Sequence, residues 1–414
     1  MSAGYYLAGK VGGIATFELA IRRLPANRDW VIAAGIERAV EYLTGLSFEE
    51  AEIEYLRGLP NLKNAPAGFF EALRDFRFTG DVDAVSEGTA LLAGEPLLSL
   101  RAPLMEGQIP ETYLLSAITF ETLIATKAAR IVDAAAGRPV LEFGTRRAHT
   151  PEAGTIGARA AYIGGCAGTS NTLTGFRYGI PVFGTSAHSW VMSFPSEIEA
   201  FRELQTLLGE YTVQLIDTYD AVEGARRAAA VGNPLWGVRI DSGDLLGLSR
   251  KVRLILDQAG LPHVRIMASG DLEEKRIAEL VASGAPIDAF GVGTELATSG
   301  DAPSMGMTYK LVELDENGGR RYTAKRSADK SSLPAAKQVW RFADRDVVST
   351  AEERFEGAAP LLLPLIRNGT PVKPPGTLDE ARLRAAESRR ALRPDHRVEY
   401  SETLARIIES VRRS

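Results

Sequence analysis

The chain has 414 residues, 45% of them hydrophobic and 24% charged, which is typical of a soluble globular protein with two or three domains. Its formal net charge of −5 argues against nucleic acid and anionic membranes as partners. The single cysteine, Cys166, excludes an internal disulfide, and no apolar run approaches the length of a membrane span. The first residues lack the apolar core of a signal peptide, so we expect a cytoplasmic protein.

The first part of the chain mixes helical and β patterns. Residues 14–56 predict a strand followed by helices, the longest of them over 30–46. Short alternating runs broken by glycine and proline at 69–109 predict a small antiparallel β unit. A long helix is expected over 113–136, where a glycine and a proline follow the last apolar positions.

From residue 140 onward, short apolar runs alternate with helical segments. The apolar runs are 140–143, 181–183, 213–216, 237–240, 264–268 and 287–292. The helical segments between them are 154–163, 197–208, 220–231, 245–258 and 273–283. This repetition implies a parallel sheet, and polar clusters at every strand end favour an α/β fold with a (β/α) barrel. An open doubly wound sheet is the alternative, but no G-x-G-x-x-G motif follows the first strand.

The last hundred residues change character again. A further strand is expected at 309–314, and the tail at 378–414 reads as two helices rich in arginine and glutamate, whose charges form a solvated face. We therefore expect three parts: a β-rich α+β N-terminal domain at 1–112, the barrel at 113–315, and a C-terminal segment with a helical tail at 316–414 that packs back on the N-terminal domain.

The ends of the expected strands carry the groups that chemistry needs. The stretch PVFGTSAHSW at 181–190 predicts a strand that breaks at Gly184 and presents His188 among hydroxyls. The alternative is a core histidine satisfied by a neighbouring hydroxyl. Arginines at strand ends of an acidic chain indicate an anionic ligand, since guanidinium binds phosphate or carboxylate through paired hydrogen bonds.

Two further loops suggest a phosphorylated sugar. Glycine turns at 268–271 and 291–294 open into helices, where backbone N–H groups can face a phosphate, although a tight turn explains each of them singly. Asp241 and Asp244 follow a strand, where carboxylates hold ribose hydroxyls or a magnesium ion. A helix N-cap is the other explanation for this pair. These patterns predict an enzyme acting on a phosphorylated sugar, without giving the reaction.

Several motifs in order along the chain resemble the nicotinate phosphoribosyltransferases. They are LEFGTRRAHTPEAG (141–154), GTSN (168–171), GTSAHSW (184–190), RIDSGDL (239–245), FGVGTEL (290–296) and KQVWR (337–341). The resemblance implies that nicotinate and 5-phosphoribosyl-1-pyrophosphate give nicotinate mononucleotide and pyrophosphate, coupled to ATP hydrolysis, in NAD salvage. It also implies an irregular (β/α) barrel paired with a β-rich N-terminal domain. The same resemblance implies Mg²⁺ with the pyrophosphate or ATP, and a homodimer with its site at the subunit boundary.

The resemblance also assigns roles to residues. His188 would be phosphorylated, and Asp241 would act at the ribose hydroxyls or at magnesium pyrophosphate. Phe143 would stack on the pyridine ring, while Arg146 and Arg239 would hold anionic groups. The remaining substrate-binding residues implied are Thr145, Thr169, Ser170, Ser242, Gly270, Gly291, Gly293 and Thr294. The GTSN segment has no carboxylate to repel that of nicotinate, which favours the acid over the amide.

The N-terminus departs from the family pattern. The family begins with a threonine-aspartate-leucine-tyrosine motif whose tyrosine stacks on the substrate ring, whereas this chain starts MSAGYY. We expect either a start further upstream or substitution by Tyr5 or Tyr6. Three alternative functions are a nicotinamide phosphoribosyltransferase, a phosphosugar aldolase or isomerase, and a binding scaffold. A Schiff-base aldolase needs a strand-end lysine, and the candidate, Lys310, instead begins a strand.

Overall fold

The computed structural model describes residues 1–316, 318–327, 331–374 and 376–413. The chain forms two compact units: unit 1 comprises Met1–Leu123 and Ser304–Ser414, and unit 2 comprises Ile124–Pro303. Helix α6 (Glu111–Ala134) runs through the boundary between them in the sequence. None of the helices in the described part of the chain is both long and apolar enough to span a bilayer.

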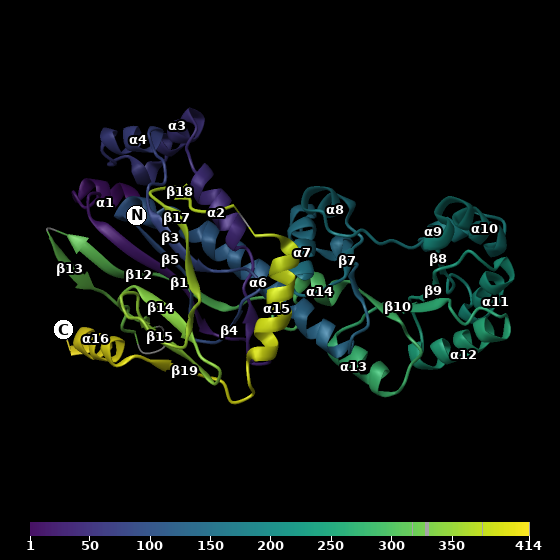
Figure 1. Ribbon diagram of the computed structural model, residues 1–414. Coiled ribbons are helices and arrows are strands. Elements are labelled where there is room, and N and C mark those ends of the chain that lie inside the picture. The colour runs from purple at the N-terminus through teal and green to yellow at the C-terminus, as the bar shows by residue number, and fades with distance from the viewer. Residues whose placement is uncertain (317, 328–330, 375, 414) are drawn as a thin grey trace. The chain divides into compact units, whose positions relative to one another are not determined.

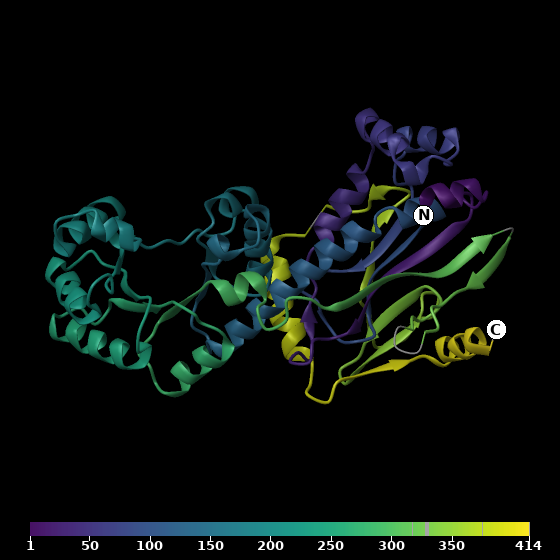
Figure 2. The same cartoon turned by 180° about the vertical axis from the view of Figure 1, so that it is seen from behind.

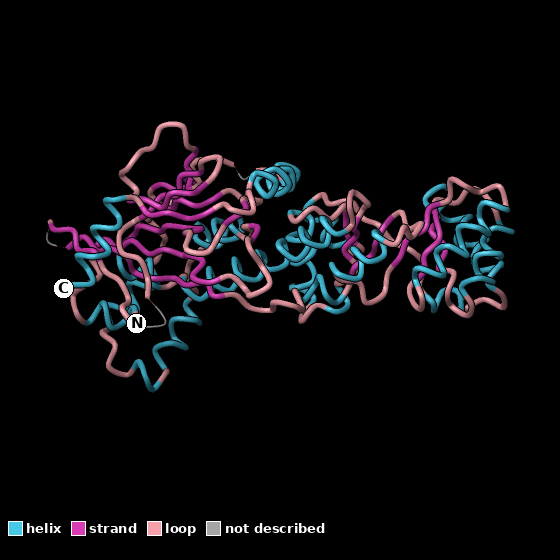
Figure 3. The backbone as a smooth tube through the Cα atoms, turned by 90° about the horizontal axis from the view of Figure 1, so that it is seen from below, coloured by secondary structure: helices cyan, strands magenta, loops and turns pink. Residues whose placement is uncertain are grey.

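Unit 1 is built on a seven-stranded antiparallel sheet that draws strands from both ends of the chain. In order across the sheet the strands are β13 (Gly319–Tyr322), β12 (Gly306–Glu316), β1 (Ile14–Arg23), β5 (Pro96–Pro103), β3 (Asp81–Val85), β17 (Leu362–Arg367) and β18 (Thr370–Pro371). β1 pairs with β12 on one side and with β5 on the other. Figure 3 shows these strands lying side by side.

A second sheet shares the core of unit 1. Its strands are β16 (Ala359–Pro360), β14 (Lys337–Arg341), β15 (Arg345–Thr350) and β19 (Arg397–Tyr400). Leu19 and Leu98 of the larger sheet belong to the same buried cluster as Val339, Val348 and Leu404. A two-stranded ribbon pairs β2 (Val31–Ile32) with β4 (Ala90–Leu91). The helices are α1 (Ser2–Leu7), α2 (Ile36–Gly45), α3 (Glu50–Gly58), η1 (Pro60–Leu62), α4 (Ala67–Arg74), α5 (Leu104–Gln108), α15 (Leu378–Ala391) and α16 (Glu402–Arg413).

Two expectations for unit 1 need correction. The helix expected over 30–46 begins only at Ile36, because Val31 and Ile32 pair with Leu91 and Ala90 instead. The β unit expected over 69–109 opens with α4, which buries Phe69, Phe70 and Leu73. That spacing of apolar residues fits one face of a helix better than one face of a strand.

Unit 2 contains the expected parallel sheet. Its strands are β7 (Gly168–Thr169), β6 (Val140–Glu142), β11 (Ala289–Val292), β10 (Arg265–Ala268), β9 (Gly237–Ile240) and β8 (Val213–Leu215), paired in this order. The helices are η2 (Thr145–Arg147), α7 (Pro151–Ile163), α8 (Thr172–Tyr178), α9 (His188–Met192), α10 (Glu197–Leu208), η3 (Gly209–Tyr211), α11 (Ala221–Val231), α12 (Leu245–Gln258), α13 (Glu274–Ala282) and α14 (Thr294–Thr298). The sheet is a half-barrel, with β7 and β8 at its edges.

The interior strands of this sheet are short and almost wholly buried, as in β11, where all four residues are buried. Helices cover these strands because both faces of a parallel sheet are apolar and are shielded from solvent. Figure 1 shows α11 and α12 beside β9, and both helices contact that strand. Seen from behind in Figure 2, the chain between α8 and α9 runs as an extended segment.

That extended segment overturns one predicted strand. Residues 181–183 form only an isolated bridge from Val182 to Thr169, and the side chains of Val182 and Phe183 are 47% and 41% exposed. Pro181 has no N–H to donate, which limits the ladder at this point. The strand that completes this edge of the sheet is instead β7, which the apolar pattern did not reveal.

Candidate active site at the strand ends of unit 2

Arg239 lies at the centre of the polar residues that follow the parallel strands. It is on β9, and its guanidinium donates to the hydroxyls of Ser269 and Thr185, both at 2.7 Å. It also donates to Oδ1 of Asp241 at 2.5 Å. These three partners come from three different loops, so a single half-buried arginine joins the segments after β9 and β10 to the segment before α9.

Asp241 and His188 face each other across this cluster. Oδ1 of Asp241 accepts from the hydroxyl of Ser269 at 2.5 Å, and Oδ2 lies 3.7 Å from Nε2 of His188. The other ring nitrogen of His188, Nδ1, lies 3.2 Å from the hydroxyl of Thr218. The imidazole is therefore held on both sides, yet its side chain remains 43% exposed. An imidazole that is held in one orientation and is also exposed can react with a substrate that enters from solution.

The pKa of Asp241 is lowered by its surroundings. Burial acts to raise it, but the hydrogen bond from Ser269 and the positive charge of Arg239 outweigh the burial. The carboxyl therefore keeps its negative charge at neutral pH, so it can face a cation or accept hydroxyl hydrogen bonds.

The loop after β9 is held by a second aspartate. Oδ2 of Asp217 accepts from the backbone N–H of Asp241 at 2.8 Å and from the hydroxyl of Ser242 at 3.0 Å. Asp244 instead caps α12 by accepting from the N–H of Gly247 at 3.1 Å. Of the two carboxylates in the DSGD sequence, one therefore faces the cluster and the other caps a helix.

Phe143 provides an aromatic wall beside Arg239. The guanidinium carbon of Arg239 lies 5.6 Å from the centre of the Phe143 ring. The ring packs over Gly291, where an added Cβ would come within 2.6 Å of a ring carbon. A glycine is required at this position because any side chain would displace the ring.

The predicted glycine turns at 268–271 and 291–294 both lie at the ends of strands of the parallel sheet. Gly270 has a φ of +86°, and an added Cβ would lie 1.9 Å from the carbonyl oxygen of Asp241. Gly293 precedes Thr294, the exposed first residue of the five-residue helix α14. Both turns therefore lie beside the loops that carry Asp241 and Phe143.

The remaining predicted residues divide into exposed and buried groups. Arg146 and Ser170 are exposed, and the Arg146 guanidinium has no hydrogen-bond or ion-pair partner among the described residues. Thr169 is fully buried, and its hydroxyl donates to Oε2 of Glu142 at 2.5 Å. The hydroxyl of Thr145 accepts from the side-chain amide of Asn171 at 3.1 Å. Thr145 and Thr169 therefore bind other loop residues, while Arg146 and Ser170 are open to solvent.

A cavity of about 730 Å³ opens beside this cluster. Its walls are mostly apolar, and Phe143 after β6 and Thr185 before α9 connect it to the cluster. Trp236, Arg265 and Ala289 line it at the amino ends of β9, β10 and β11. An apolar pocket with a few convergent polar groups is the usual form of a small-molecule site.

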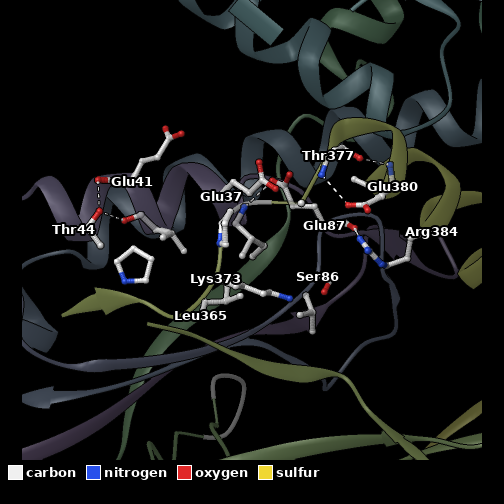
Figure 4. Close-up of a pocket in the computed structure, with 17 residues that line it drawn as sticks. Glu37, Glu41, Thr44, Ser86, Glu87, Leu365, Lys373, Thr377, Glu380 and Arg384 are labelled. Atoms are coloured by element: carbon white, nitrogen blue, oxygen red, sulfur yellow. Dashed lines mark hydrogen bonds between the residues drawn. The ribbon is translucent and has the colours of Figure 1, made fainter. Parts of the chain in front are cut away.

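A second cavity, in unit 1, has a different character. It has a volume of about 480 Å³, and Figure 4 shows four glutamates, one lysine and one arginine at its walls: Glu37, Glu41, Glu87, Glu380, Lys373 and Arg384. Several of these charges serve the local fold. Glu87 accepts from the N–H groups of Gly35 and Ile36 at the start of α2, and Arg384 donates to the carbonyl of Glu87.

Thr218 and Glu142 are not among the site residues predicted from the sequence. Thr218 follows β8 in the same way that the predicted residues follow their strands, so its position was an available signal. Glu142 is a carboxylate at the end of an apolar run, which is itself an unusual feature. Within the described ranges, no three histidine, cysteine, aspartate or glutamate side chains gather as ligands for a metal.

Two family models match the chain. The model of the nicotinate phosphoribosyltransferase N-terminal domain matches residues 1–119, and that of the nicotinate phosphoribosyltransferase family matches residues 139–358. A nicotinate phosphoribosyltransferase of Mycobacterium tuberculosis is 43% identical over 95% of this chain and 85% of its own length. One from Bacillus subtilis is 41% identical over 86% of this chain and 73% of its own length.

Two solved structures have a similar fold. The crystal structure of human nicotinic acid phosphoribosyltransferase superposes with a TM-score of 0.83 and 26% identity, covering 99% of this chain and 98% of that one. A nicotinate-nucleotide pyrophosphorylase from Pyrococcus furiosus has a TM-score of 0.78 and 28% identity, covering 94% and 92% of the two chains.

Proposed function

Because the chain belongs to the nicotinate phosphoribosyltransferase family, we propose that it forms nicotinate mononucleotide and pyrophosphate from nicotinate and 5-phosphoribosyl-1-pyrophosphate, in NAD salvage. The observation that supports this most is the gathering of Phe143, Arg239, Asp241 and His188 at the carboxyl ends of the parallel strands. The aromatic ring can stack on the pyridine ring, and the guanidinium can bind an anionic group. The charged carboxylate can accept from ribose hydroxyls or bind magnesium, and the exposed imidazole can receive a phosphoryl group.

The pyridine ring would stack on Phe143, which lines the cavity. Arg146 would bind an anionic group of a substrate, since its guanidinium is exposed and has no partner among the described residues. Ser170 offers a second exposed polar group on the neighbouring loop. The glycine turns at Gly270 and at Gly291–Thr294 would place backbone N–H groups toward the 5′-phosphate, aided by Ser242 and Gly293.

The reaction needs little proton transfer. The ring nitrogen of nicotinate attacks the anomeric carbon, the new C–N bond forms, and pyrophosphate leaves with the electron pair of the broken C–O bond. The ring nitrogen becomes cationic, so no base is required. The protein would act by holding the reactants in line and by stabilising positive charge on the ribose, a task that suits the ionised Asp241.

A magnesium ion would arrive with the pyrophosphate. Mg²⁺ commonly binds one or two carboxylates together with substrate phosphates and water, rather than a cage of protein ligands. Asp241 fits this pattern, since its Oδ2 carries no hydrogen bond from Arg239 or Ser269. When bound, the ion would neutralise charge on the leaving pyrophosphate.

ATP would act through His188. Its exposed imidazole lies between Thr218 and Asp241, so a phosphoryl group could be received there and later be released by hydrolysis. We propose that phosphorylation changes the affinity of the site for its substrates. We also propose a cytoplasmic homodimer whose sites lie at the subunit boundary, in which an N-terminal tyrosine completes the ring site. Within unit 1, the hydroxyl of Tyr5 donates to Gln108.

The choice of base tests the proposal. Purified protein is given phosphoribosyl pyrophosphate, magnesium and either nicotinate or nicotinamide, and kcat/KM is measured for each. We expect nicotinate to be preferred by at least about tenfold, because no carboxylate of the 168–171 segment opposes its charge. Equal use of both bases, or a preference for the amide, would refute the assignment.

A further inference from the structure

Glu142 is a buried carboxylate that the reaction described above does not use. It is the last residue of β6 and is 2% exposed. Its carboxylate accepts from the backbone N–H groups of Gly144 and Thr145 and from the hydroxyl of Thr169, the last at 2.5 Å. Burial raises its pKa, and the three donors oppose that rise. A carboxylate is seldom buried without such a set of donors.

The hydrogen bonds of Glu142 continue into a closed ring that joins two loops. The hydroxyl of Thr169 accepts from the N–H of Asn171 at 2.9 Å. The side-chain amide of Asn171 donates to the hydroxyl of Thr145 at 3.1 Å. The N–H of Ser170 donates to the carbonyl of Glu142 at 2.9 Å. The loop after β6 and the loop after β7 are thereby joined by the Glu142 carboxylate, the Glu142 carbonyl and the Asn171 side chain.

These two loops carry three of the groups to which the proposed function gives a role in substrate binding. Phe143 lies directly after Glu142, Arg146 lies in the helical turn that Glu142 holds, and Ser170 lies directly after Thr169. Glu142 is not among the described residues that line the 730 Å³ cavity, whereas Phe143 is. Its influence on a bound ring would therefore pass through the loops.

We propose that Glu142 is a positioning residue that sets the affinity for nicotinate by holding the Phe143 loop and the Ser170 loop in one arrangement. The inference rests on the proposed function, and it adds a residue to which the motif resemblance gave no role. Two of the three partners of Glu142 are backbone N–H groups, which can only donate, and the Thr169 hydroxyl also donates to it.

The test compares Glu142→Gln with Thr169→Val. A glutamine turns an NH₂ group toward one of the donors, and a valine removes the hydroxyl while keeping the shape. Each variant should raise the KM for nicotinate by at least about tenfold, with the KM for phosphoribosyl pyrophosphate changed by less than about twofold. The double variant should be little worse than either single one, because both break the same contact. Thr169→Ser should restore the wild-type KM.

The control is Glu152→Gln, which removes an exposed carboxylate from the first turn of α7 and should leave both KM values unchanged. A role in stability alone would lower the melting temperature and the amount of active enzyme but leave both KM values alone. That result, or additive effects in the double variant, would overturn the proposal. If Glu142→Gln does not fold, the test rests on Thr169→Val alone. An unchanged KM for nicotinate in that variant would then overturn the proposal. Wild-type protein that makes no nicotinate mononucleotide would instead refute the proposed function.

Discussion

Nε2 of His188 lies 3.7 Å from Oδ2 of Asp241, while the same aspartate receives a hydrogen bond from Arg239. His188 begins a short helix after a long extended segment, and Asp241 follows an inner strand of the parallel sheet. Their proximity brings the proposed phosphoryl acceptor next to the proposed ribose or magnesium site. A phosphoryl group on His188 would therefore lie close enough to Asp241 to affect the proposed ribose or magnesium site directly.

His188→Ala should abolish the stimulation by ATP, because no other group in this cluster offers an exposed imidazole among the described residues. Transfer of label from γ-labelled ATP to the protein should disappear as well. The matched control is His263→Ala, a histidine whose Nε2 lies 2.9 Å from Oδ1 of Asn233. Labelling of the His188 variant at the wild-type level would remove that residue from the role.

Arg239→Ala should lower kcat/KM by at least about 30-fold, equivalent to about 2 kcal/mol of transition-state binding. The substitution removes a guanidinium that holds Asp241, Ser269 and Thr185 together. Arg226→Ala is the control, since that arginine is exposed on α11 and pairs with Glu223. Steady-state kinetics on both variants measures the difference, and near-equal values would contradict the prediction.

The lowered pKa of Asp241 predicts a pH-dependent stability difference. A carboxyl whose pKa is lower in the folded protein stabilises the fold above the unfolded pKa, and that contribution is lost as the pH falls through the folded value. The melting temperatures of wild type and Asp241→Asn should therefore differ by a constant amount from about pH 5 to pH 7 and converge below about pH 4, given the ordinary pKa of 3.8. A difference that stays constant down to about pH 3 would show that the fold does not lower this pKa.

Gly270→Ala tests the close approach of the glycine turn to Asp241. Gly260 has a similar left-handed φ of +74° but nothing within 4 Å of an added Cβ, so Gly260→Ala measures backbone strain alone. We expect Gly260→Ala to lower the free energy of unfolding by about 1 kcal/mol and to leave activity intact. Gly270→Ala should be more destabilising and should also lower kcat/KM. Equal effects of the two substitutions would mean that the approach to Asp241 has no consequence.

The local parts of the fold could be predicted from the sequence. The helices at 197–208 and 245–258 have the expected bounds, since their apolar spacing and capping residues act within a few turns. The strand-end positions of Arg239 and Asp241 followed from the repetition of apolar runs. The order of strands in unit 1 could not be predicted, because β1 pairs with β12 and β3 pairs with β17, and the partners in each pair are almost 300 residues apart in the sequence.

The proximity of the candidate site residues was predicted from the sequence, whereas their individual contacts were not. Phe143, Arg239, Asp241 and His188 lie together as the motifs suggest, and Thr169 was expected to bind substrate. The structure shows that the hydroxyl of Thr169 is buried against Glu142, a contact between two loops that no spacing along one strand reveals. The prediction of a strand at 181–183, before His188, was wrong for a similar reason. An apolar run does not show whether a partner strand is present.

The central claim is that these strand ends form one site for nicotinate and phosphoribosyl pyrophosphate. The most direct measurement is the mass and amount of the products when purified protein is incubated with both substrates, magnesium and ATP. We predict nicotinate mononucleotide and pyrophosphate in equal amounts, and almost none from the Arg239→Ala protein under the same conditions. Absence of the mononucleotide from the wild-type reaction, or the same yield from the Arg239→Ala protein, would contradict the account.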